Sequence, residues 1–131
     1  MLLRWYKYAS FFELWQTHEW DLHLIYIIGE RHHCYVGSIG SKDGGGLHTR
    51  YQKQYIDRAK AIFGASEPKR QPAFAARIPK GIPCQKIKDI EATVQHALIR
   101  VHGNDAALFR PIKKFTPVPL HHKGNPPAFL A

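Results

Sequence analysis

Cysteine, acidic side chains and long apolar runs are all scarce in this sequence of 131 residues. The two cysteines, Cys34 and Cys84, lie far apart and form no closely spaced pair. This excludes a disulfide-rich scaffold and fits a reducing compartment, so we expect a cytoplasmic protein. No stretch reaches about 18 uncharged apolar residues, which is what a membrane-spanning helix would need. The N-terminal segment 1–22 carries several charges within its aromatic run, unlike a signal peptide.

Positive charge, in contrast, is abundant. Nineteen Lys and Arg residues stand against ten Asp and Glu residues, which gives a formal net charge of +9 at pH 7. Such an imbalance favours a polyanionic partner, of which nucleic acid is the commonest. An anionic membrane surface is the alternative. We expect DNA, most plausibly double-stranded, and no membrane.

The pattern of apolar residues predicts one α+β domain. We expect an amphipathic helix over 2–20, strands over 23–29, 33–40 and 73–79, and helices over 47–63 and 85–102. Gly103 should end the last helix. The predicted fold is a small three-stranded antiparallel sheet flanked by helices. Its parts are an N-terminal helix within 1–22 that packs on the core, a core over 23–104, and an extended, basic, proline-rich tail over 105–131.

Two tyrosines and an arginine are the first candidates for chemistry. Tyr26 and Tyr35 lie on the two strands of a predicted hairpin, whose strands should be about 5 Å apart. Arg50 falls in the first turn of the helix that follows. A guanidinium can grip two phosphate oxygens, and a phenol can position or deprotonate a water molecule. Simple packing is the other explanation for tyrosines in strands.

These segments resemble the GIY-YIG nuclease family. Leu24-Ile25-Tyr26 takes the place of the family's first motif, Tyr35-Val36-Gly37 that of its second, and a glycine turn and an Arg-bearing helix follow. The resemblance spans residues 23 to about 104. It implies that both tyrosines lie near the attacking water and that Arg50 contacts the scissile phosphate. It also implies a glutamate on a later helix that holds one divalent ion, Mg²⁺ or Mn²⁺, in each active site.

On this resemblance we expect a metal-dependent endonuclease that hydrolyses DNA phosphodiester bonds. A restriction, homing or mobile-element role would fit, with a monomer or a homodimer on the DNA. Two alternatives stay open. One is a catalytically inactive module of this fold that binds nucleic acid, and the other is a nuclease directed at RNA.

The metal-binding glutamate is where the sequence departs from the family. The family's Glu-x-x-Leu-Ile frame reads Gln95-His96-Ala97-Leu98-Ile99 here. Three explanations compete. Gln95 could be an inactivating substitution of a glutamate that an active form would have. Glu91, one helical turn earlier and on the same helix face, could be the metal ligand instead. Or the chain could be a natural binder without nuclease activity.

Further residues are expected to assist. His48 or Tyr55 could serve in place of a family residue that follows the arginine, and Asn104 could be the asparagine that follows the glutamate helix. Basic side chains of the core and of the tail are expected to hold the nucleic-acid backbone. The predicted nucleic-acid-binding residues are Lys42, Lys53, Arg58, Asn104, Lys113, Lys114 and Lys123.

Overall fold

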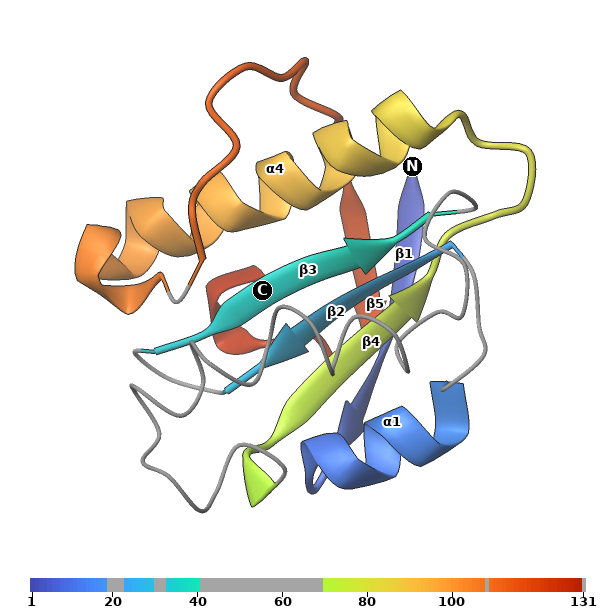
Figure 1. The fold of residues 1–131 in the computed structure, drawn as a ribbon, viewed down its shortest axis with the longest axis vertical. Coiled ribbons are helices and arrows are strands. Elements are labelled where there is room, and N and C mark those ends of the chain that lie inside the picture. The colour runs from blue at the N-terminus through green and yellow to red at the C-terminus, as the bar shows by residue number, and fades with distance from the viewer. Residues whose placement is uncertain (19–22, 30–32, 41–69, 108, 131) are drawn as a thin grey trace.

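A computed structural model describes residues 1–18, 23–29, 33–40, 70–107 and 109–130. In these ranges the chain forms an α+β fold with a mixed five-stranded sheet and two α-helices (Figure 1). The elements in chain order are β1 (Leu2–Tyr8), α1 (Phe11–His18), β2 (Leu24–Ile28), β3 (Tyr35–Ile39), β4 (Ala73–Arg77), α4 (Cys84–His102), and β5 (His121–Gly124). Short 3₁₀ turns, η3 (Asn104–Ala106) and η4 (Ala128–Leu130), follow α4 and β5.

The sheet has the strand order β3-β2-β4-β1-β5, in which β1 and β5 are parallel and the other neighbours are antiparallel. The α+β class is confirmed, but the expectation of a three-stranded antiparallel sheet is wrong. The three expected strands, β2, β3 and β4, form one half of the sheet. Two strands from the chain ends, β1 and β5, extend it on the β4 side.

The central elements follow from their local sequence patterns. Every residue of β2 and β3 is buried, as expected for short apolar runs in the middle of a domain. The predicted helix over 85–102 is confirmed as α4, whose stripe of Ile87, Ile90, Val94 and Leu98 is buried. Gly103 ends it with a φ of 86°, and its N–H donates to the carbonyl of Ile99.

The predicted N-terminal helix over 2–20 is wrong in its first half. Residues 2–8 form β1, in which Leu3 and Trp5 are buried while Leu2, Arg4 and Tyr6 are exposed. This alternation has the period of a strand. The helix begins only after Ser10, whose Oγ accepts a hydrogen bond from the N–H of Glu13 at 3.3 Å. The Ser-x-x-Glu sequence is a helix-start signal, so the boundary lies where a cap could form.

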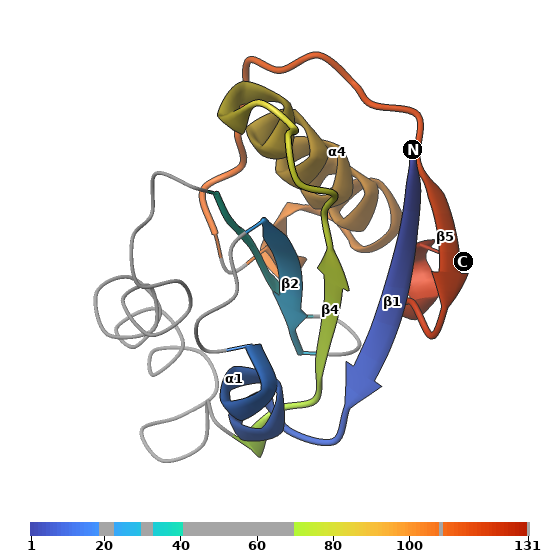
Figure 2. The same cartoon turned by 90° about the vertical axis from the view of Figure 1, so that its right-hand side faces the viewer.

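The C-terminal tail is extended, as expected, but it also supplies a strand. Its backbone crosses α4 and then pairs as β5 with β1, from Leu2–His121 to Trp5–Gly124 (Figure 2). The terminal amino group of Met1 donates to Pro119 O, and the N–H of Asn125 donates to Trp5 O. The two ends of the chain are thereby joined in one sheet.

Alternation along the strands defines the two faces of the sheet. Tyr26 lies opposite Gly37 and Ala75, and its ring contacts Phe11 of α1 at 6.4 Å between centroids. Ser38, one residue on from Gly37, points to the other face and lies 3.5 Å from Lys88 of α4. We call these sides the α1 face and the α4 face.

Several expected features lie outside the described residues. These are the turn at 30–32, the glycine-rich turn at 41–46 and the helix over 47–63 with its arginine. In the described parts of the chain, no helix is long and apolar enough to cross a membrane.

The link between β1 and β5 should depend on pH. Nε1 of Trp5 donates to Nδ1 of His122 at 2.8 Å. Burial lowers the pKa of His122 below 6.5, and the neighbouring His121 lowers it further. Because the folded state favours neutral His122, the stability from this group is complete above pH 6.5. It is lost as the pH falls through the lowered pKa.

We therefore expect the midpoint of thermal unfolding to fall as the pH drops below about 6.5. In His122→Gln, whose side-chain oxygen can still accept from Trp5 but does not titrate, this fall should be smaller. Melting curves across this pH range would measure the difference. An identical pH dependence in the two proteins would contradict this role of His122.

Candidate nucleic-acid site

The structure brings Tyr26 and Tyr35 together, as the hairpin pattern predicts. Their rings stack with centroids 6.1 Å apart and planes inclined by 24°. Tyr26 lies opposite Gly37, two residues along β3 from Tyr35, so the two tyrosines are diagonal neighbours on the α1 face. This confirms that both side chains project from the same side of the hairpin.

Gly37 makes room for this pair. A Cβ atom at position 37 would lie 2.6 Å from both Cζ and the hydroxyl oxygen of Tyr26, and 3.0 Å from a ring carbon of Tyr35. The two distances to Tyr26 are shorter than real Cβ atoms show, so the Tyr26 ring occupies the space that a side chain on β3 would fill. The ring of Tyr26 therefore explains why Gly37, in the Tyr35-Val36-Gly37 motif, is a glycine.

The tyrosine pair belongs to a longer row of buried rings. Phe11 of α1 continues the row beside Tyr26, and Phe109 meets Tyr35 edge-on at 6.5 Å. Tyr26 is 2% exposed and Tyr35 is 8% exposed. In this arrangement both phenols contribute to the core. Any ligand must reach them at the edge of Tyr35 or through a rearrangement of what covers them.

Gln95 contacts β3, the outermost described strand on one side of the sheet. Its side chain is buried, at 3% exposed. Nε2 donates to the carbonyl of Val36 at 3.4 Å, and Oε1 accepts from the N–H of Ile112 at 3.0 Å. A carbonyl and an N–H need one donor and one acceptor, which an amide supplies and an ionised carboxylate does not. Position 95 is thus chemically matched to glutamine.

Glu91 lies one turn earlier on the same helix, above the other end of β3. It is 7% exposed, and its Oε2 is 3.5 Å from Nζ of Lys88, which in turn is 3.5 Å from Oγ of Ser38. The printed contacts of α4 with β3 are thus made by Gln95 to Val36 and by Lys88 to Ser38, and Glu91 lies beside Lys88. The carboxylate already has a cation beside it.

Glu91 belongs to a helix on the other side of β3 from the tyrosine pair. Ser38, which contacts Lys88 of α4, and Gly37, which lies opposite Tyr26, point to opposite faces of β3. Among the described residues, no three His, Cys, Asp or Glu side chains gather as a metal-binding group. Gln95 has no charge with which to hold a cation, and both ends of its amide are engaged, so position 95 as it stands does not fit the Mg²⁺ or Mn²⁺ site that the family resemblance implies.

The remaining predicted residues fall into two groups. Asn104, Lys113, Lys114 and Lys123 are exposed, the first in η3, the next two in the tail above α4, and the last on β5. The other group lies outside the described residues. It consists of Lys42, His48, Arg50, Lys53, Tyr55 and Arg58.

Polar side chains of α4 hold the tail, and the sequence alone does not predict this role. His96 Nε2 donates to Ile112 O at 2.8 Å, and Thr93 Oγ1 accepts from the N–H of Val118 at 3.1 Å. Asp89 accepts from the N–H of Thr116 at 3.3 Å. Their sequence signal is a polar stripe on α4 opposite the apolar one. This pattern is equally typical of a solvent-exposed helix face.

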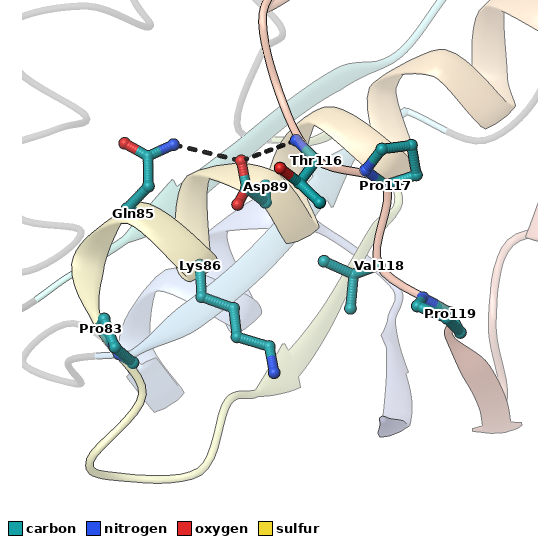
Figure 3. A pocket seen from close by; sticks show the side chains of 8 residues that line it. All are labelled: Pro83, Gln85, Lys86, Asp89, Thr116, Pro117, Val118 and Pro119. Carbon is teal, nitrogen blue, oxygen red and sulfur yellow. Dashed lines mark hydrogen bonds between the residues drawn. The ribbon is translucent and has the colours of Figure 1, made fainter.

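A shallow groove of about 430 Å³ lies between the start of α4 and the tail (Figure 3). Asp89 accepts there from Nε2 of Gln85 as well as from the tail, so its carboxylate is engaged in holding the two walls together. The groove is lined by Pro83, Gln85, Lys86, Asp89, Thr116, Pro117, Val118 and Pro119. None of the predicted site residues is among them.

Comparisons with protein-family models, with curated proteins and with solved structures gave no match.

The fit between Gly37 and Tyr26 can be measured directly. Gly37→Ala should destabilise the fold by about 1–3 kcal/mol, because the added methyl overpacks the site. In a Tyr26→Leu background the same change should cost much less, since the ring that it meets is gone. Denaturant unfolding of the four proteins would give the coupling energy. If the two substitutions change the free energy of unfolding additively, Gly37 is not required by the ring of Tyr26.

Proposed function

We propose that this chain is a nucleic-acid-binding module with a GIY-YIG-like core, which binds the phosphodiester backbone without a resident metal ion. The observation that carries the proposal is the amide at position 95. Both ends of this side chain are used by the fold, at the place where the resemblance implies a metal-binding glutamate. This favours a natural glutamine over an inactivating substitution.

The charge of the chain supports the nature of the partner. The formal net charge of +9 is accompanied by exposed Lys113 and Lys114 in the part of the tail that crosses α4. Exposed cations that neutralise phosphates release counterions, so binding should weaken steeply as salt is added. The order of the central elements supports the core assignment, because β2, β3, β4 and α4 follow one another as the resemblance implies.

A metal-dependent endonuclease is the second candidate. The stacked Tyr26 and Tyr35, with Gly37 shaped to receive them, favour it because these residues carry the resemblance. Glu91 would then be the carboxylate involved, and it would have to exchange its contact with Lys88 for a ligand. DNA and RNA are both substrates to test for this candidate.

A nicking assay separates the two candidates. The chain should shift supercoiled plasmid in a gel yet leave it un-nicked in Mg²⁺ or Mn²⁺, and a structured RNA should likewise stay intact. The same assay would include Gln95→Glu and Glu91→Gln, with the exposed carboxylate variant Asp105→Asn as a matched control.

Each other outcome has a defined meaning. If the chain itself nicks plasmid, and if Glu91→Gln abolishes this activity while Asp105→Asn preserves it, the chain is an endonuclease with Glu91 as its carboxylate. Nicking by Gln95→Glu alone would make position 95 the metal site and the present chain a disabled nuclease. Failure to bind any nucleic acid would refute both candidates.

A further inference from the structure

Among the described elements, no helix contacts β5 on the α1 face. Helix α1 packs near the end of β1, where Tyr8 Oη contacts Nε2 of His18 at 2.6 Å. The first part of β1 and the neighbouring β5 lie at the opposite end of the strand, beside the N-terminus (Figure 2). Leu2, within the pairing with β5, is 47% exposed, and Tyr6, one residue past that pairing, is 52% exposed. An exposed tyrosine ring in the middle of a strand invites a stacking partner.

Basic side chains lie in a row across the same area. Arg4 of β1 is the direct cross-strand partner of Lys123 of β5, and both are exposed. Tyr6 and Arg4 are two residues apart on β1, so the ring and the two cations share one face. Continuing the register of β1 and β4 by one residue places the exposed Arg77 next to Arg4.

Like charges directly opposite each other on neighbouring strands destabilise a sheet. A lysine on a short edge strand has a known protective use, since it discourages pairing with another chain. That use accounts for Lys123 alone. It does not account for Arg4 on the inner strand or for the exposed ring of Tyr6 beside it. An anion that bridges Arg4 and Lys123 would remove their repulsion.

We propose that this surface, made of Arg4, Tyr6 and Lys123, binds a single-stranded segment of nucleic acid. The cations hold successive phosphates, and one unpaired base stacks on the Tyr6 ring, as on aromatic platforms of other single-strand binders. A duplex offers its phosphates but keeps its bases stacked inside, so it cannot use the ring. The inference rests on the proposed function for the class of partner and adds a second surface to it.

Fluorescence anisotropy with labelled oligothymidylate, oligouridylate and a DNA duplex tests the proposal. Tyr6→Thr keeps a residue that favours strands and removes the ring, so it should weaken single-strand binding about tenfold. Tyr6→Phe should restore it, and duplex binding should change little in either variant. The relative affinity for the two oligonucleotides shows whether RNA or DNA is the preferred strand.

The charge contribution is read from the salt dependence. Arg4→Gln together with Lys123→Gln should reduce the slope of log K against log salt by about 1.4 for a single strand, because two phosphate contacts are lost. Lys80→Gln together with Lys86→Gln removes the same charge from exposed positions elsewhere and should leave this slope almost unchanged. Thermal melting of each variant confirms that it is folded.

The outcomes distinguish this surface from the proposed function. If the parent chain binds and the Arg4 and Lys123 variant behaves like the Lys80 and Lys86 variant, the surface is refuted and the proposed function stands. If the parent chain binds no nucleic acid, the proposed function fails and the inference fails with it. If Arg4, Tyr6 and Lys123 are needed instead for binding phosphatidylserine vesicles, the partner is a membrane surface and the assignment is overturned.

Discussion

The extended tail must find partners for its backbone groups, and α4 supplies them. Prolines at 111, 117 and 119 have no N–H to donate, and α4 side chains accept from residues 112, 116 and 118. Gln95 is central because its other end reaches the carbonyl of Val36 in β3, so that one side chain ties helix, sheet and tail together. Buried or half-buried amides left without partners would cost about 1–3 kcal/mol each. This arrangement delivers the tail to β1, where it completes the sheet as β5.

The tyrosine pair and Glu91 lie on different sides of the sheet. Tyrosines 26 and 35 pack on the α1 face with Phe11, while Glu91 lies on the α4 face with Lys88. A carboxylate at position 95 would face the carbonyl of Val36 without a proton to donate. Positive charge, in contrast, lies on exposed positions in the tail and across β1 and β5. These exposed cations are the groups to which the proposed function assigns the phosphate contacts.

The parts of this fold that could be predicted are those with a local signal. Strands β2, β3 and β4 and helix α4 have strong apolar periodicity, and the contact between Tyr26 and Tyr35 follows from a short hairpin. The sequence predicts a helix across β1 because Trp5, Tyr8 and Phe11 are spaced by three and continue into the true helix, which hides the spacing by two of Leu3 and Trp5. Strand β5 has no local signal, since His121-His122-Lys123 becomes a strand only through the open edge of β1. The role of Gln95 depends on the N–H of Ile112, a partner that no spacing on the helix reveals.

Thermal unfolding of Gln95→Glu, with and without Mg²⁺, tests most directly whether position 95 is built for an amide. The account predicts a lower melting temperature than that of the parent chain. The carboxylate cannot donate a hydrogen bond to the carbonyl of Val36, and it places a charge in a buried position. Mg²⁺ should not restore the melting temperature. A ligand that binds only the folded state raises its stability. A melting temperature that Mg²⁺ raises in Gln95→Glu but not in the parent chain would therefore contradict the account and make this position a metal site.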